Sequence, residues 1–185
     1  MKPVCLVLGA GAGIGGTVAA KFASEGYHSC LCRRSDQEGL DRLVKGIEDD
    51  GGSANGYLIN AIEDNVIEDL INSIESDVGP IEVVVYNLGA QTGIKLLKDT
   101  THKEFEWGWR MASLGLFRVA KVLCPIMKER GKGTILVTSA TAAMRGNATQ
   151  HSHAAAMGAR RMLCQSLNAE FSASNIHVAH IVIDG

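Results

Sequence analysis

Short apolar runs alternate along this chain with longer segments in which apolar side chains recur every three or four residues. A short, nearly continuous apolar run rich in β-branched residues is typical of a buried strand, whereas the longer spacing is typical of an amphipathic helix. The runs predict strands at Val4–Leu8, His28–Cys32, Ala54–Ile59, Ile81–Tyr86, Thr134–Thr138 and Ile176–Ile183. The spaced segments predict helices at Gly13–Glu25, Asp36–Asp50, Glu63–Asp77, Thr101–Arg130 and Ser152–Ser174.

This alternation predicts the fold class. Strands separated by helices of such length are joined by right-handed crossovers, which produce a parallel sheet covered on both faces. With 185 residues the chain has the length of one domain. We therefore expect a doubly wound α/β fold that occupies residues 1–185 as a single domain.

Composition and charge exclude several classes of protein. Hydrophobic residues make up 46% of the chain and charged residues 21%, which excludes a disordered tail, a collagen-like fibre and a coiled-coil rod. The net charge of −2 gives no basic excess for a nucleic acid. No apolar run approaches the ~20 residues that span a bilayer, and the first residues lack a signal-peptide pattern. We expect a cytoplasmic protein without nucleic-acid or membrane partners.

The cysteines are odd in number and lack the close pairing of a zinc site. This argues against a disulfide framework and against a structural metal, and we expect buried thiols in the apolar runs. The chain contains Cys5, Cys30, Cys32, Cys124 and Cys164.

A glycine-rich loop, Leu-Gly-Ala-Gly-Ala-Gly-Ile-Gly, joins the first predicted strand to the first predicted helix. Glycines allow the backbone to turn tightly there and to approach a pyrophosphate, which the N–H groups of the helix start then bind. A purely structural turn is the alternative. The position at the start of a βαβ unit favours a dinucleotide site.

The spacing of Gly9, Gly13 and Gly15 resembles that of the short-chain dehydrogenase/reductase family, whose first loop reads Gly-x-x-x-Gly-Ile-Gly. Further matches follow in order: Asn-Leu-Gly-Ala at 87–90 resembles the family's Asn-Asn-Ala-Gly, and segments 125–135 and 163–178 resemble those around its fifth and sixth strands. The resemblance implies a Rossmann-type sheet and a nicotinamide dinucleotide. It assigns cofactor contacts to Gly9, Gly13, Ile14, Gly15, Asn60, Ala61, Asn87, Gly89 and Ala90.

The end of the second strand selects the cofactor in this family. A carboxylate there binds the ribose 2′-hydroxyl of NAD, whereas basic residues favour the 2′-phosphate of NADP. Arg33 and Arg34 occupy this place, and the first carboxylate is Asp36. Guanidinium groups suit phosphate, so we expect NADP(H) rather than NAD. The alternative is a solvated arginine and a site that binds neither form well.

The resemblance also assigns catalysis to an Asn, a Ser, a Tyr and a Lys, with the Tyr and Lys spaced Tyr-x-x-x-Lys. These positions hold Ser113, Ala140, His153 and Met157 in this chain. A thioether carries no charge and accepts hydrogen bonds only weakly, so it cannot replace the Lys ammonium.

Two nearby residues offer a partial replacement. His153 could act as the acid without a neighbouring cation, because histidine titrates near 6.5, and Ser139 lies one residue before the usual Ser. The alternatives are that His153 is only a polar residue at a helix start and that Ser139 faces away. A metal on His151 and His153 is disfavoured, since no further ligand lies nearby.

Two functions follow from these residues. One is an NADP(H)-dependent oxidoreductase of carbonyl or alcohol substrates with an atypical active site. The other is an inactive dinucleotide-binding sensor, scaffold or oligomer partner. A domain that binds no nucleotide is a third and weaker reading. The residues do not indicate which substrate would be used.

The chain ends at Gly185, where the family continues into a substrate-covering segment and one more edge strand, so the chain is a fragment or that wall is absent. A helical stripe predicts a homodimer or homotetramer through the long helix. It contains Phe105, Trp109, Ala112, Leu116, Val119, Ala120 and Leu123.

Overall fold

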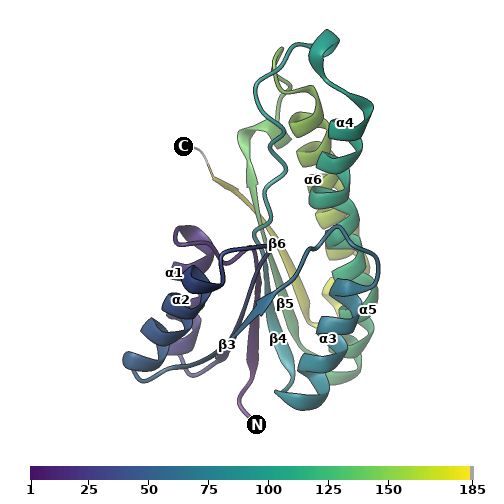
Figure 1. Cartoon of the computed structure of the whole chain (residues 1–185). Coiled ribbons are helices and arrows are strands. Elements are labelled where there is room, and N and C mark those ends of the chain that lie inside the picture. The colour runs from purple at the N-terminus through teal and green to yellow at the C-terminus, as the bar shows by residue number, and fades with distance from the viewer. Residues whose placement is uncertain (184–185) are drawn as a thin grey trace.

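Six strands form one parallel sheet in the order β3-β2-β1-β4-β5-β6 in the computed structural model, which describes residues 1–183 (Figure 1). The strands are β1 (Val4–Leu8), β2 (His28–Arg33), β3 (Ser53–Leu58), β4 (Ile81–Tyr86), β5 (Gly133–Ala140) and β6 (Ile176–Ile183). The helices are α1 (Ile14–Ser24), α2 (Gln37–Asp49), α3 (Val66–Asp77), α4 (His102–Trp109), α5 (Gly115–Arg130) and α6 (His151–Phe171). The predicted doubly wound α/β fold is confirmed.

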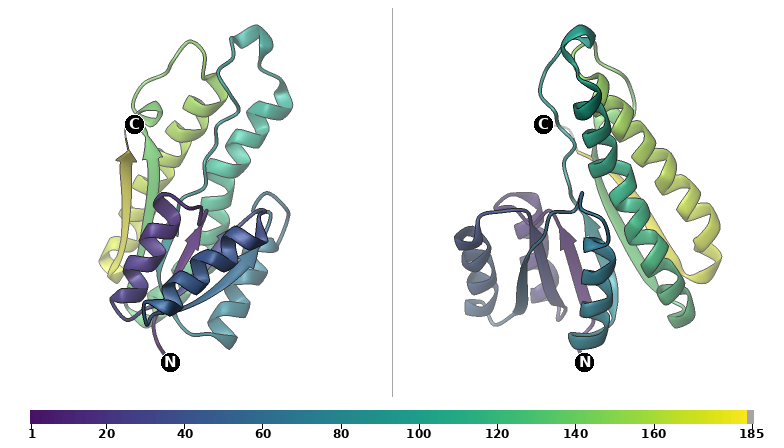
Figure 2. Two further views of the ribbon diagram at one scale, coloured as in Figure 1. Left: turned by 60° about the vertical axis from the view of Figure 1, so that its left-hand side comes forward. Right: turned by 45° about the vertical axis from the view of Figure 1, so that its right-hand side comes forward.

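The helices cover the sheet in two layers. Helices α1 and α2 lie on one face, and α3, α5 and α6 lie on the other (Figures 1 and 2). The chain moves outward from β1 to β3 and then returns to β4 on the other side of β1. The loops that follow β1 and β4 therefore leave the sheet in opposite directions, and this switch point is where doubly wound sheets bind ligands.

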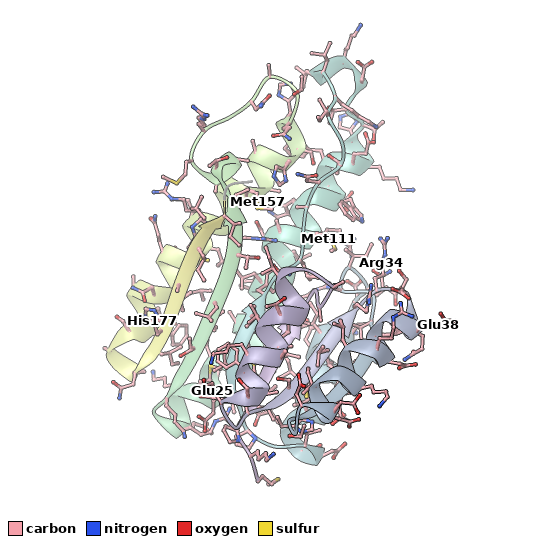
Figure 3. The ribbon with its side chains drawn as sticks, turned by 90° about the vertical axis from the view of Figure 1, so that its left-hand side faces the viewer. Glu25, Arg34, Glu38, Met111, Met157 and His177 are labelled. Carbon is pink, nitrogen blue, oxygen red and sulfur yellow. The ribbon has the colours of Figure 1, made fainter. Side chains whose placement is uncertain are left out.

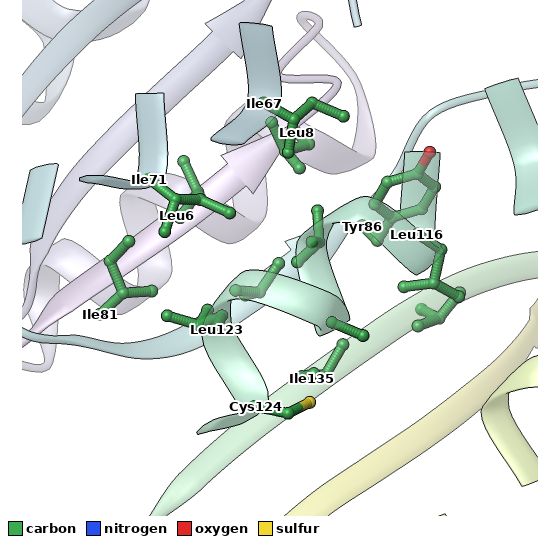
Figure 4. Packing of buried hydrophobic residues seen from close by; sticks show 14 of the residues in the cluster. Leu6, Leu8, Ile67, Ile71, Ile81, Tyr86, Leu116, Leu123, Cys124 and Ile135 are labelled. Carbon is green, nitrogen blue, oxygen red and sulfur yellow. The ribbon is translucent and has the colours of Figure 1, made fainter. Parts of the chain in front are cut away.

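Successive residues of the central strand pack on opposite faces of the sheet. Leu6 and Leu8 of β1 belong to the larger apolar cluster, under α3, α5 and α6, part of which Figure 4 shows. Cys5 and Val7 belong to a second cluster, under α1 and α2. Because both faces are covered, the strand is apolar at every position.

Several predicted boundaries need correction, among them the end of α6, which lies at Phe171 and not at Ser174. Helix α3 begins at Val66 and not at Glu63, because Asn65 adopts a left-handed conformation with φ 65°. Strand β5 continues to Ala140, two residues beyond its predicted end. A π-helical segment at Arg110–Leu114 divides the predicted helix Thr101–Arg130 into α4 and α5.

The stripe predicted to form an oligomer interface is also different in the structure. Most of its residues are buried inside this chain. Leu116, Val119, Ala120 and Leu123 of α5 belong to the larger apolar cluster, and Ala112 of the π-helical segment packs in a small cluster with residues of α6. Phe105 and Trp109 remain 47% and 44% exposed, and Phe117 of α5 is 47% exposed. Within the predicted stripe, Phe105 and Trp109 are therefore the side chains that a partner could contact.

All five cysteines are free and buried, as predicted for those in the apolar runs. Within the described part of the chain, none of the helices has the length and apolar character that crossing a membrane would require.

Candidate functional site

The glycine loop turns sharply at the carboxyl end of β1. Gly9 has φ 95°, its N–H donates to the carbonyl oxygen of Cys32 at 2.9 Å, and its own carbonyl accepts from Asn87 Nδ2 at 2.9 Å. A Cβ at Gly9 would lie 2.6 Å from the Asn87 carbonyl oxygen. Both the positive φ and the close approach require glycine at this position.

Gly15 and Gly13 differ in what surrounds them. A Cβ at Gly15 would lie 2.2 Å from the Gly9 carbonyl oxygen, so the first turn of α1 fits against the loop only with glycine there. A Cβ at Gly13 would meet no atom within 4 Å. Gly13 is the N-cap of α1 and has no side chain to cap the helix. The Gly16 N–H donates to the Gly11 carbonyl at 2.8 Å, so among the described residues the N–H groups of Ile14 and Gly15 are the first-turn donors that suit an anion.

The end of β2 and the end of β3 meet the loop at a small cavity of about 30 Å³. Its lining brings together predicted site residues that lie far apart in the sequence, Gly9, Arg33, Arg34, Asn60 and Ala61.

The two arginines at this cavity differ in their partners. Arg33 Nη2 lies 3.0 Å from Asp36 Oδ2, while Asp36 Oδ1 accepts the N–H of Gly39 at 2.9 Å and caps α2. Asp36, the first carboxylate after β2, is thus committed to a helix cap and to Arg33. Arg34 is exposed in the bend between β2 and α2 (Figure 3), and no ion pair among residues 1–183 includes it.

Asn60 is partly exposed, whereas its neighbour Ala61 is buried. Asn60 Nδ2 donates to Glu63 Oε1 at 2.8 Å, which orients the amide and leaves Oδ1 as an acceptor. Ala61 is 6% exposed and belongs to the larger apolar cluster.

Asn87 uses its side chain to hold the strand ends together. Its Nδ2 donates to Gly9, and its Oδ1 accepts from Thr138 Oγ1 at 2.8 Å. Both ends of the amide are engaged within the protein. Its contribution is to fix the glycine loop relative to β4 and β5.

A second cavity of about 260 Å³ extends from the glycine loop to α6. It is lined by Ile14, Asn87, Leu88, Gly89, Ala90, Gln91, Thr138, Ser139, Ala140, His153, Met157, Arg160 and Ile183. A Cβ at Gly89 would meet no atom within 4 Å, so this glycine borders open space. This cavity therefore holds four of the predicted cofactor residues, Ile14, Asn87, Gly89 and Ala90, together with both predicted catalytic residues, Ser139 and His153.

His153 is buried in the first turn of α6, with 5% of its surface exposed. It hydrogen-bonds to the backbone of Ala90, while its Nδ1 has no partner among the described residues. Burial lowers the pKa of His153, the Ala90 bond raises it in part, and the charge of Arg160 lowers it further. The lowered pKa favours the neutral ring, whereas a general acid must hold its proton at the working pH.

Ser139 faces α6 and does not point away from the site. Its Oγ lies 3.8 Å from Met157 Sδ, and both side chains are buried. Ser113 Oγ donates to the carbonyl oxygen of Ala156 at 3.2 Å, which joins the π-helical segment to α6. Met157 lies above the carboxyl ends of the strands (Figure 3).

A third and larger cavity, of about 540 Å³, adjoins the second. Ala140, His153, Gln91 and Ile183 line both. The remaining lining is mostly polar and includes Thr141, Arg145, Asn147 and Gln150. A small polar molecule in this space would lie next to His153.

The sequence profile described as short chain dehydrogenase matches residues 3–183. The chain belongs to the short chain dehydrogenase family.

Similar proteins agree with this family and fold. The crystal structure of a short-chain dehydrogenase from Rhodopseudomonas palustris is 33% identical, covers 99% of this chain and 85% of its own, and superposes with a TM-score of 0.93. The crystal structure of a gluconate 5-dehydrogenase from Burkholderia cenocepacia, in complex with NADP and tartrate, is 25% identical. The match covers 98% of this chain and 71% of that one, with a TM-score of 0.89.

Among curated relatives, the 3-oxoacyl-[acyl-carrier-protein] reductase FabG of Thermotoga maritima is 28% identical over 177 residues, 95% of this chain and 70% of that protein. The next relatives are covered to 66% or less of their own length. This chain thus spans about two thirds of the length of the dehydrogenases and reductases that it matches.

Arg160 is the site residue that sequence reasoning missed. It lines the 260 Å³ cavity and is 1% exposed. A charged residue in a helix is normally taken as solvated. The only signal is its place three residues after Met157, on the same face of α6.

The described residues contain no group of three or more His, Cys, Asp or Glu side chains that could hold a metal ion. His151 and His153 are not joined there by a third ligand.

Proposed function

We propose that this member of the short chain dehydrogenase family binds NADP(H) and reduces ordinary carbonyl substrates very slowly or not at all. One observation carries the proposal. The glycine loop, which excludes a Cβ at Gly9 and Gly15, opens into a cavity bordered by a buried His153 and a buried Met157.

The proposed dinucleotide site uses mainly backbone. Gly9, Gly13, Ile14 and Gly15 would receive the pyrophosphate at the N-terminus of α1, where free donors and the helix dipole favour an anion. Asn60 would accept from the adenine amino group next to Ala61. Gly89 and Ala90 would border the nicotinamide end of the cavity, with Asn87 behind them.

The preference for NADP(H) over NAD rests on the two arginines. Arg34 has no carboxylate partner among the described residues, so a 2′-phosphate could accept its guanidinium donors. Arg33 lies in the same cavity, and its pair with Asp36 keeps that carboxylate from the ribose. Members of the family bind NAD or NADP, so the proposed preference for NADP(H) rests on these two arginines and not on family membership.

The side chains at the family's catalytic positions are poorly suited to proton transfer, which supports slow carbonyl reduction. A bound dinucleotide supplies or accepts a hydride, and the protein must exchange a proton with the substrate oxygen. We place Ser113, Ala140, His153 and Met157 at the family's Asn, Ser, Tyr and Lys positions. Met157 holds no proton and no charge, Ala140 has no hydroxyl, and His153 has a lowered pKa.

The second candidate is an active oxidoreductase in which His153 is the acid and Ser139 polarises the carbonyl. The favouring observation is that both residues line the cavity that Ile14 and Gly89 also line. Substitution His153→Ala distinguishes the two. Loss of a measurable carbonyl reduction in that variant would establish His153 as the acid, and unchanged NADPH binding without turnover in either protein supports the inactive reading.

A fluorescence titration of the full chain with NADPH and with NADH tests the proposal. We expect tighter binding of NADPH and no consumption of it across a panel of aldehydes and ketones. Equal affinity for both dinucleotides would refute the cofactor preference, and rapid consumption would refute the slow chemistry.

We also propose self-association as a homodimer or homotetramer through the exposed aromatics Phe105, Trp109 and Phe117. Large exposed aromatic side chains are enriched at protein interfaces. Sedimentation velocity at micromolar concentration tests this, and a monomer would contradict it.

A further inference from the structure

Arg160 is a buried cation without a counter-ion. Its side chain is among the largest that are fully buried, and none of the ion pairs formed within residues 1–183 includes it. Burial lowers the pKa of Arg160, but a guanidinium stays protonated at neutral pH. The site therefore holds one fixed positive charge.

Three backbone carbonyls solvate this charge. Arg160 Nε donates to Ala112 at 3.0 Å, Nη1 donates to Thr138 at 2.9 Å, and Nη2 donates to Leu88 at 2.7 Å. The acceptors come from the π-helical segment, from β5 and from the loop after β4. These carbonyls are neutral, so they stabilise the guanidinium and leave its net charge of one unneutralised.

The position of Arg160 is fixed by a second set of contacts. Its guanidinium carbon lies 5.1 Å from the centroid of the Tyr86 ring, and Tyr86 Oη donates to the Met111 carbonyl at 2.5 Å. Carbonyls of a π-helical segment lose their regular helical partners. Tyr86 and Arg160 supply donors to two of them, which keeps the cation in one place.

The same cation borders the cavity that we assign to the nicotinamide end. Neither Asp nor Glu is among the described residues that line this cavity, and His153 carries a lowered pKa. Arg160 is thus the charged residue of that lining. A charge held away from water acts over many ångström, because the effective dielectric constant is far below that of water.

We propose that Arg160 makes this site selective for the reduced over the oxidised dinucleotide. The inference rests on the proposed function, since it needs the nicotinamide in this cavity. The reduced ring is neutral, whereas the oxidised pyridinium carries a positive charge that Arg160 repels. At an effective dielectric constant of about 20, two like charges about 10 Å apart favour the reduced form by on the order of tenfold.

Isothermal titration of the full chain with NADPH and with NADP⁺ at one salt concentration measures this ratio. We expect NADPH to bind on the order of tenfold more tightly. Arg160→Gln should bring the ratio close to one, and Arg160→Lys, which retains the charge, should preserve it. A residue with a merely structural role would weaken both ligands alike. Binding of 2′-phospho-ADP-ribose, which lacks nicotinamide, should be the same in all three folded proteins.

Met157 offers a test that leaves Arg160 intact, should its variants fail to fold. Met157→Lys adds a second cation to the cavity and should raise the NADPH preference further, whereas the uncharged control Met157→Leu should leave it unchanged. Equal affinities for NADPH and NADP⁺ in the unmodified chain, or an unchanged ratio in Met157→Lys, would overturn this inference and leave the proposed function intact. Absence of binding by either dinucleotide would overturn the proposed function as well.

Discussion

The glycine loop after β1 and the first turns of α6 border one cavity, but the structural requirements on their residues differ. In the loop, a Cβ at Gly9 or Gly15 would lie 2.6 or 2.2 Å from a backbone oxygen, so the fold itself demands glycine. In α6, His153 and Met157 are buried side chains, and buried positions tolerate replacement by side chains of similar volume far better than these glycines tolerate a Cβ. The binding side of the cavity is therefore tied to folding, whereas the reacting side can change without loss of the fold.

Charge separates the two regions further. The loop presents uncharged backbone donors at the N-terminus of α1, as an anion requires. The α6 side presents a neutral thioether and a histidine with a lowered pKa, and its fixed cation, Arg160, is bound to three carbonyls. The residues that bind a cofactor and the residues that transfer a proton are thus separate parts of this fold.

Rebuilding the reacting side should have the largest effect. The triple variant Ala140→Ser, His153→Tyr and Met157→Lys should gain on the order of 10²–10⁴-fold in carbonyl reduction, the contribution typical of general acid catalysis. Steady-state NADPH consumption measures it. The matched control carries His153→Phe in place of His153→Tyr and should show no gain. An equal gain in both would mean that the new hydroxyl is not the acid.

Removing the exposed arginine tests the binding side. Arg34→Gln should weaken NADPH binding by about 1.5–3 kcal/mol, the value of a hydrogen bond to a charged group, and should leave NADH unaffected. Arg42→Gln, on the exposed face of α2, is the matched control. The prediction fails if both dinucleotides weaken together.

Adding one methyl group to the loop tests the steric demand. Gly15→Ala should destabilise the protein by about 1–3 kcal/mol and weaken NADPH binding, because the backbone must shift to admit the Cβ. Urea unfolding and the NADPH titration measure the two effects. Gly11→Ala is the control, since a Cβ there meets no atom within 4 Å. Similar losses in both variants would contradict the distinction between these glycines.

Low pH should slightly reduce the free energy of unfolding of the protein. The pKa values of His153 and His180 are lowered in the folded chain, so the unfolded chain binds more protons. The free energy of unfolding is then at its full value above the ordinary histidine pKa near 6.5. It falls as pH drops through the lowered pKa values of the folded chain, by about 1.4 kcal/mol for each unit by which the folded and unfolded pKa values differ. Urea unfolding between pH 5 and 8 (roughly the range in which histidine titrates) should show a flatter profile in His153→Gln. His102→Gln, an exposed residue of α4, should keep the original slope.

The sequence predicted the order and type of all strands and main helices. Buried parallel strands produce continuous apolar runs, and the glycine loop marks the first βα turn, so both signals are local. The family resemblance assigned the glycine loop, Arg33, Asn60 and Asn87 to one cofactor site, and these segments all follow the carboxyl ends of strands in the parallel sheet. The structure brings them together there.

Other features depended on contacts that a linear pattern does not carry. The π-helical segment at Arg110–Leu114 inserts into a continuous helical period, and its carbonyls find donors on β4 and α6. The burial of Arg160 requires three acceptors from three distant segments. The pair between Arg33 and Asp36 depends on the left-handed turn at Asp36, with φ 70°.

A single-turnover fluorescence trace tests the central claim most directly. The full chain, in excess over NADPH, is mixed with the cofactor and a panel of aldehydes and ketones, and the cofactor signal is followed over time. We expect an immediate change on binding and then a nearly constant signal. A rapidly decaying signal would show hydride transfer at ordinary rates, and a trace without the initial change would show that no dinucleotide binds; either result would refute the proposed function.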